Sequence, residues 1–261
     1  MLSGQSRFTA SLCRKACLTM LAVGICACLY IASNGEMEHQ AFSLQRLGIL
    51  GVGLMCVALM RGGEITTSTV HAGMTLNWRA LGRVLIGNLV GIALVLLVAT
   101  LLGAAMWQQG QWGLSALNIA LVKIHYGYWE LVALGVLSNM GLCLAIWLSR
   151  VAEGTVLKLM TLFAPIWLFL NTGIEHVMIN LILIPMGFVV LHFAPEAFWS
   201  VTQSDPGLYT DLTLTNLVFD NLLPVLLGNL VGGWGMIGLV HLWLDRDEQD
   251  PLLLDELDGE K

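Results

Sequence analysis

The sequence predicts an all-α polytopic membrane protein with six transmembrane spans, arranged as two inverted three-helix repeats. Three observations support this: long apolar runs, polar interruptions within two of them, and a pentapeptide found in each half. Hydrophobic residues make up 57% of the 261 residues and charged residues 11%, against about 25% charged in soluble domains. This composition excludes a soluble globular protein. A net charge of −6 without a Lys/Arg cluster excludes a nucleic-acid partner.

Six segments are long and apolar enough to cross a bilayer, which takes roughly 20 residues per helix. They cover residues 15–33, 42–76, 80–107, 128–149, 156–192 and 214–244. The second and fifth are too long for one helix, and polar or glycine-containing stretches at residues 61–69 and 171–176 interrupt them. We therefore expect both helices to be broken. The six cysteines form neither a disulfide framework nor a zinc pattern, so no metal or cofactor is expected.

The basic residues predict the orientation of these spans, because Lys and Arg accumulate in cytoplasmic loops. The loops on one side hold nine of them: Arg7, Arg14, Lys15, Arg79, Arg83, Arg150, Lys158, Arg246 and Lys261. The opposite loops hold only Arg46 and Lys123. Both termini are thus expected in the cytoplasm. Residues 1–244 form a single transmembrane channel domain in this interpretation, and the acidic residues 245–261 form a disordered tail.

The pentapeptide Gly-Asn-Leu-Val-Gly occurs at residues 87–91 and again at residues 228–232. Each copy lies in the third span of its half, and each half has a broken middle span. The repeats extend over about 15–107 and 128–244. Because each contains an odd number of spans, the two halves must have opposite orientations in the membrane. Inverted repeats with discontinuous helices are typical of transporters and channels, whose substrate path lies between the breaks.

His176 is the leading candidate functional residue of the second break. Unwound backbone at membrane depth requires protein or a water-containing cavity around it, so the breaks indicate a pore or binding site. A histidine titrates near physiological pH, and ionisable groups inside membranes usually face a pathway or a partner. The alternative is a neutral histidine bonded within the bundle. Glu175 is expected to satisfy backbone amides or to hold a loop, because an acidic group is unfavourable beside an anion path.

Other polar residues have structural interpretations beside functional ones. Thr66 and Thr67 can satisfy freed carbonyl groups, or one of them can orient the histidine, and Glu64 can pair with Arg61. Lys123 is either a solvated surface lysine or a cation that steers anions toward the entrance. Two further groups of residues are expected to be structural. The asparagines inside apolar helices, which are Asn88, Asn139 and Asn229, would form hydrogen bonds between helices. The large apolar residues Met55 and Phe169 would belong to the core.

Several motifs together resemble the formate/nitrite transporter family, and within it the formate-channel branch. They are Gly-Gln-Trp-Gly-Leu at 110–114, Leu-Cys-Leu-Ala-Ile-Trp at 142–147, Gly-Ile-Glu-His at 173–176, Asn180 with Ile-Pro-Met-Gly at 184–187, and Asp-Asn-Leu-Leu-Pro-Val at 220–225. The resemblance covers nearly the whole chain. It implies an aquaporin-like protomer in a homopentamer, surrounded by lipid in a bacterial inner membrane, with one substrate pore through each subunit.

The resemblance also implies roles for individual residues. His176 would be the central histidine, Thr67 the threonine that bonds it, and Lys123 the cation of the outer vestibule. The remaining pore positions would be Asn139 and Asn229 as paired asparagines, Phe169 as a constriction, and Ile65, Thr66 and Met55 as lining, with Glu175, Glu64 and Asn88 in support. Formate is then the expected substrate, in a channel that passes the anion alone or together with a proton.

Two departures from the family pattern leave other substrates open. Residues 64–67 read Glu-Ile-Thr-Thr where the family usually has an acidic residue followed by Leu-Phe-Thr, and Gly51 stands where the formate branch commonly has Phe. Both changes would widen the constriction, which favours a broader set of weak-acid anions such as nitrite or hydrosulfide. A neutral-solute channel of the aquaglyceroporin type is a different class, but its Asn-Pro-Ala pairs are absent from both breaks. The sequence contains no hydrolase or metalloprotease motif, so an enzyme is not expected.

Overall fold

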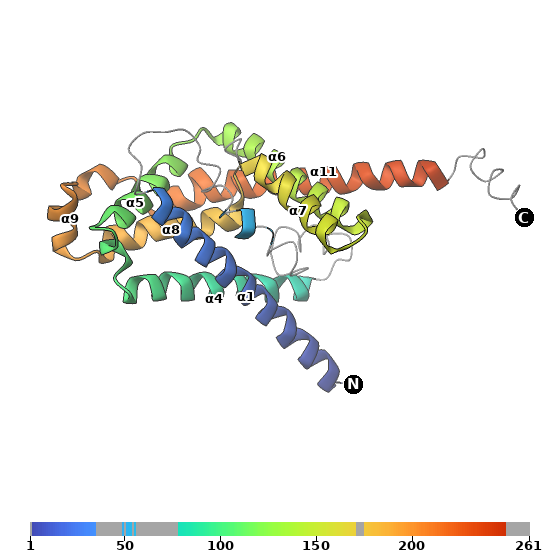
Figure 1. The fold of residues 1–261 in the computed structure, drawn as a ribbon, viewed down its shortest axis with the longest axis horizontal. Helices are drawn as coiled ribbons and strands as arrows, with labels where there is room; N and C mark the ends of the chain where they lie inside the picture. The colour runs from blue at the N-terminus through green and yellow to red at the C-terminus, as the bar shows by residue number, and fades with distance from the viewer. Residues whose placement is uncertain are drawn as a thin grey trace, which may run out of the picture.

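The regular elements of the chain are helical wherever the structure describes them (Figure 1). This computed structural model describes residues 2–34, 49, 51–53, 55, 78–170 and 175–248. The α-helices are α1 (Leu2–Asn34), α4 (Trp78–Leu101), α5 (Gln111–Ile124), α6 (Tyr128–Val151), α7 (Thr155–Leu170), α8 (Val177–Phe193), α9 (Glu196–Thr202), α10 (Leu214–Asn216) and α11 (Leu223–Glu248). Two short 3₁₀ turns, η1 (Ala104–Met106) and η2 (Pro206–Tyr209), and the π-helical turn η3 (Leu217–Leu222) connect them.

Four helical stretches among the described residues are long and apolar enough to cross a membrane. They are Leu12–Ser33, Gly82–Leu101, Tyr128–Ser149 and Pro206–Gly235, and a fifth is added if α8 and α9, which meet at 106°, count as one span. The predicted second segment lies mostly outside the described residues. The predicted fifth segment divides into the shorter helices α7 and α8. The all-α class is confirmed, whereas six spans in inverted repeats and an aquaporin-like arrangement stay predictions.

The two copies of the pentapeptide pack their helices in the same register. A Cβ atom on Gly87 of α4 would collide with the carbonyl oxygen of Cys13 in α1, and one on Gly228 of α11 would collide with that of Val132 in α6. Glycine is needed at both positions because the facing backbone approaches too closely for any side chain. The sequence repeat is therefore also a repeat in helix packing.

The asparagines of the two pentapeptides also make equivalent contacts. Asn88 Nδ2 donates to the carbonyl oxygen of Ala16 at 3.1 Å, and Asn229 Nδ2 donates to that of Gly135 at 2.9 Å. Both asparagines are fully buried. Each amide thus binds a helix backbone one turn beyond the close glycine contact, so the pair α1 with α4 and the pair α6 with α11 are built alike.

The apolar-run criterion does not predict helix α5, because its 14 residues are too few to cross a bilayer. Its 14 residues bury one face, including Trp112 and Ala116, against α8. The close contact is again made by a glycine, since a Cβ on Gly187 of α8 would meet Ala116 and Ala120. This packing places the last turn of α5, with Lys123, beside the beginning of α8.

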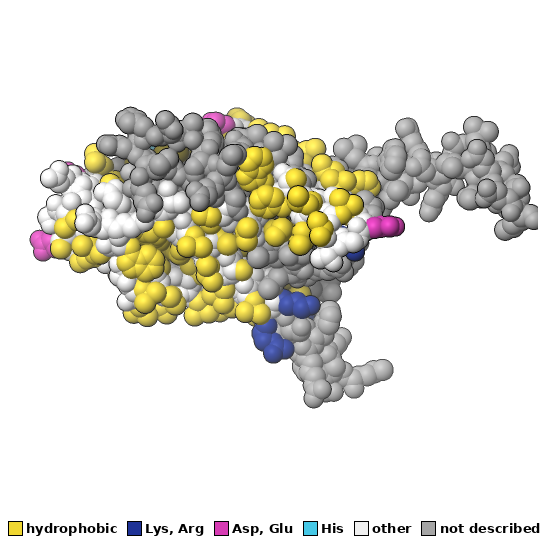
Figure 2. Space-filling model, in the orientation of Figure 1, with side chains coloured by type: hydrophobic (Ala, Val, Ile, Leu, Met, Phe, Trp, Pro, Cys, Tyr) yellow, Lys and Arg dark blue, Asp and Glu magenta, His cyan; other side chains and the backbone are white. Residues whose placement is uncertain are grey.

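On the face shown in Figure 2, apolar side chains cover the middle and the visible charged side chains lie at the margins. The first residues of α1 and the last of α11 both lie away from α9 (Figure 1). The exposed side chains between the ends include Leu89, Leu97 and Val98. An apolar flank is expected where lipid replaces water. The side of the membrane on which each end lies stays a prediction.

The close glycine contact gives a direct stability prediction. Gly228→Ala should lower the stability of the purified protein by about 1–3 kcal/mol, because the new methyl group meets the backbone of α6 and neither helix can yield locally. Thermal unfolding in detergent measures the loss. Gly235→Ala on the same helix is the matched control, since a Cβ there meets nothing within 4 Å. Equal midpoints for the two variants would contradict the packing argument.

Candidate functional site

The chain between α7 and α8 is not helical at Glu175 and His176, where the sequence predicts a break. Helix α7 ends at Leu170, and residues 171–174 lie outside the described part. His176 has extended backbone, with φ −127° and ψ 126°, and its carbonyl oxygen accepts hydrogen bonds from the backbone amides of Ile179 (3.0 Å) and Asn180 (3.1 Å). Only 2% of His176 is exposed. We call residues 175–177 the α8 entry.

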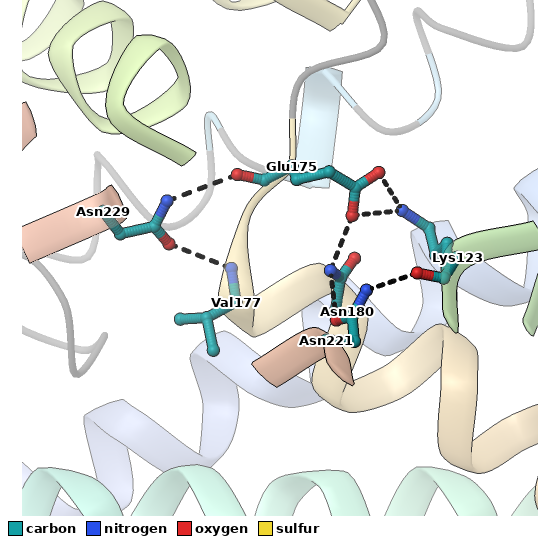
Figure 3. Close-up of polar contacts among 6 residues, drawn as sticks. All are labelled: Lys123, Glu175, Val177, Asn180, Asn221 and Asn229. Atoms are coloured by element: carbon teal, nitrogen blue, oxygen red, sulfur yellow. Dashed lines mark hydrogen bonds and ion pairs between the residues drawn. The ribbon is translucent and has the colours of Figure 1, made fainter. Parts of the chain in front are cut away.

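A single side chain, Asn229, binds the backbone on both sides of His176 (Figure 3). Its Nδ2 donates to the carbonyl oxygen of Glu175 at 3.2 Å, and its Oδ1 accepts from the amide of Val177 at 3.0 Å. These peptide groups have no helical partner, and buried unsatisfied groups are costly. A carboxamide suits the position because it offers a donor and an acceptor together. Asn229 therefore fixes the chain on each side of the histidine.

Asn139 on α6 supports this arrangement. Its Nδ2 donates to the backbone carbonyl oxygen of Asn229 at 2.5 Å, and its side chain is fully buried. Since the acceptor is a carbonyl group, the orientation of the Asn139 amide is determined. Its Oδ1 has no hydrogen-bond partner among the described residues. The two asparagines thus join α6, α11 and the α8 entry.

A buried ion pair holds the side chain of Glu175. Lys123 Nζ lies 2.7 Å from Oε1 and 2.8 Å from Oε2 of the carboxylate, with 14% of the lysine and 4% of the glutamate side chain exposed. Asn180 Nδ2 donates a third bond to Oε2 at 2.6 Å. Buried charges are tolerated when they are paired and hydrogen-bonded, and both conditions hold here.

Asn221 closes the network. Its Oδ1 accepts from Asn180 Nδ2 at 2.8 Å, and its Nδ2 donates to the backbone carbonyl oxygen of Lys123 at 2.7 Å (Figure 3). Asn221 belongs to the π-helical turn η3, an irregularity that occurs frequently at functional sites. Lys123 is consequently held at its ammonium group by Glu175 and at its backbone by Asn221. The network connects α5, α8 and η3.

Several predicted site residues meet at the α8 entry, although their contacts differ from the expectation. Lys123 is mostly buried and paired, so the interpretation as a solvated surface lysine is wrong. The carboxylate of Glu175 binds the side chains of Lys123 and Asn180, whereas backbone amides were one expected set of donors. The other expectation, that Glu175 holds a loop, stays a prediction. Asn139 and Asn229 lie together, as paired asparagines would. Within the described residues, no group of three or more His, Cys, Asp or Glu side chains is arranged to hold a metal ion.

Other predicted residues lie elsewhere or outside the described part. Asn88 belongs to the packing of α1 with α4, and the half-buried Met55 packs against the core. Phe169 is in the last turn of α7, with its side chain outside the described part. The predictions for Glu64, Ile65, Thr66 and Thr67 also fall outside the described residues. Sequence reasoning assigned no role to Asn180 or Asn221, although an amide inside an apolar run was a signal for the first.

Comparisons with known proteins all indicate the same group of proteins. The formate/nitrite transporter family model matches residues 5–243. The chain is 35% identical over 242 residues to the formate channel FocA of Escherichia coli strain K12, covering 87% of this chain and 84% of the relative. It is 38% identical to FocA of Haemophilus influenzae over 71% of this chain and 63% of that one. A solved structure described as a pentameric formate channel with formate bound superposes with a TM-score of 0.83 at 28% identity, over 91% of this chain and 98% of the other.

The buried ion pair predicts that removing Lys123 alone lowers the stability more than removing both charges. Lys123→Met should destabilise the protein by roughly 3–5 kcal/mol, because it leaves the carboxylate of Glu175 buried without its cation. Adding Glu175→Gln should restore part of the loss, since no charge then remains. Thermal unfolding in detergent reports both effects, with Lys158→Met on the exposed part of α7 as the matched control. If the double variant showed the sum of the single losses, the two groups would not be coupled.

Proposed function

The chain belongs to the formate/nitrite transporter family, and from this premise we propose that it conducts a small monocarboxylate anion, formate first, along a path past His176. Members of this family are channels and transporters, and the protein is accordingly not an enzyme. It is a multi-pass membrane protein. Its relatives in Escherichia coli and Haemophilus influenzae support a bacterial inner-membrane location.

The observation that carries the proposal is the buried, polar surrounding of His176. The imidazole lies at the beginning of an apolar helix, and Asn229 fixes the backbone on both sides of it. Such a position is expensive in free energy unless the group faces a pathway or a partner. A histidine can also change its protonation state near neutral pH. These properties suit a site that exchanges a proton with a weak acid.

Proton sharing would lower the main barrier to an anion. Bringing a bare carboxylate into a dry constriction costs several kcal/mol. If His176 gives its proton to formate, neutral formic acid crosses the driest part and releases the proton on the far side, while the imidazole regains a proton from the side of entry. Formate and one proton then cross together. Thr67 would orient the imidazole, and Phe169, Ile65, Thr66 and Met55 would line the narrow part, as the family resemblance implies.

The ion pair with Lys123 explains how the carboxylate of Glu175 can lie beside an anion path. An unpaired carboxylate next to His176 would repel formate, but Lys123 balances its charge at 2.7 Å. The pair also restrains Glu175, whose carbonyl oxygen is bound by Asn229. In this proposal Lys123 keeps the surroundings of the histidine electrically neutral, and its attraction for incoming anions is secondary. Asn139 and Asn229 would contact the solute after it passes the vestibule.

The assembly that we propose is a homopentamer with one path in each subunit. The support is the likeness to a structure described as a pentameric formate channel, at a TM-score of 0.83 and over 91% of this chain. Lipid would cover the apolar flank, which includes Leu89 and Leu97. The inverted arrangement of the two halves, with both termini in the cytoplasm, belongs to the same proposal. It is supported by the matched packing of α1 with α4 and of α6 with α11.

A broader set of weak-acid anions is the second candidate function. Gly51, which is buried, stands where the formate branch commonly has an aromatic residue, and Thr66 is the other such position. Removing two aromatic side chains would leave room for nitrite, hydrosulfide or acetate. A channel for neutral solutes is the less favoured class, because a buried histidine beside an ion pair suits proton exchange better than the passage of an alcohol.

The proton-sharing role predicts that His176→Ala and His176→Asn both reduce formate uptake into proteoliposomes by at least about tenfold. Each should also flatten the dependence of uptake on pH, because neither side chain titrates in this range. Uptake of labelled formate between pH 5.5 and 8 is the measurement. His192→Asn, at an exposed histidine of the same helix, should behave like wild type. Unchanged uptake and pH dependence in both His176 variants would exclude the relay.

The widened constriction predicts a change in selectivity. Thr66→Phe should reduce the uptake of acetate and nitrite relative to formate, because the aromatic ring narrows the path. Competition uptake with formate, nitrite, acetate and hydrosulfide, on the wild type and on this variant, measures the ratios. An equally narrow preference for formate in both proteins would contradict the broader function and leave the formate channel in place.

A further inference from the structure

An exposed pair, His125 and Asp211, lies beside the buried network that holds Lys123. The Nε2 atom of His125 is 3.0 Å from Oδ2 of Asp211, with 55% and 58% of the side chains exposed. His125 is the C-cap of α5 and follows Lys123 by two residues. Asp211 lies in the connection between η2 and α10. The pair therefore joins the end of α5 to the chain that leads into η3.

The chain around Asp211 is well ordered by its own hydrogen bonds. The backbone carbonyl oxygen of Asp211 accepts from the amide of Thr213 at 2.8 Å and from Asn216 Nδ2 at 2.9 Å. Thr213 caps α10 by accepting from the amide of Asn216 at 3.1 Å. Helix α10 continues directly into η3, which carries Asn221. A displacement of Asp211 would therefore also move Asn221, which binds the backbone of Lys123.

The end of α5 consequently has two attachments to residues 211–222. One is buried and runs from Asn221 to the carbonyl oxygen of Lys123 at 2.7 Å, and the other is the exposed bond between His125 and Asp211. We infer that His125 and Asp211 are positioning residues for Lys123, and through its ion pair for the α8 entry. The consequence for transport rests on the proposed function. No contact of either residue with the solute is required.

Formate uptake with the same pH on both sides of the vesicle tests the consequence for transport. His125→Gln and Asp211→Asn should each raise the half-saturating formate concentration by about two- to fivefold, the effect expected of an exposed pair. The double variant should be no worse than either single one, because both changes remove the same attachment. Maximal uptake should change little. The controls are His192→Gln and Glu196→Gln, exposed groups of α8 and α9.

Thermal unfolding in detergent tests the positioning without relying on transport. His125→Gln should lower the midpoint less in a Glu175→Gln background than in a Glu196→Gln background, because the ion pair that it positions is absent from the first. Equal shifts in the two backgrounds would overturn the inference, as would unchanged half-saturating concentrations for His125→Gln and Asp211→Asn. A wild-type protein that takes up no formate, yet shows the unequal shifts, would refute the proposed function and support the positioning.

Discussion

A helix that begins inside an apolar protein leaves peptide groups without partners, and the carboxamide of Asn229 satisfies those next to His176. The rest of the site follows from this one interaction. Asn229 can reach the α8 entry because Gly228 allows α11 to approach α6 closely. Asn139 then binds the backbone of Asn229 from α6. The glycine-asparagine motif is thus both the packing contact and the support of the histidine.

The ion pair of Lys123 and Glu175 solves a second problem, the charge of a carboxylate beside the proposed anion path. Glu175 precedes His176 directly, so its carboxylate is attached one residue from the histidine. Lys123 balances the charge, Asn180 donates to the carboxylate, and Asn221 binds the backbone of Lys123. The resulting site is polar and rigid, yet close to neutral. In the proposed mechanism, such a site would let His176 exchange a proton without holding an anion too tightly.

The sequence was sufficient to predict the helical class and the interruption before α8, because each depends on local composition. The role of His176 stays a prediction. The repeated pentapeptide indicated an internal repeat, and both copies lie at close helix contacts. Helix α5 was not predicted, since its 14 residues are too few for a span and lie between two apolar segments. The pairing of Lys123 with Glu175 joins residues far apart in the chain, and nothing local indicates which lysine meets which carboxylate. The role of Asn221 was not predicted, because it depends on the irregular turn η3.

The central claim is that formate passes His176 together with one proton. The most direct measurement is simultaneous recording of formate uptake and of lumenal pH in proteoliposomes, with protein-free vesicles as the baseline and the membrane potential clamped at several values. The account predicts one proton delivered for each formate above the baseline, at a rate that does not depend on the potential. Uptake that follows the potential without acidifying the lumen would show that the bare anion crosses, and would contradict the account.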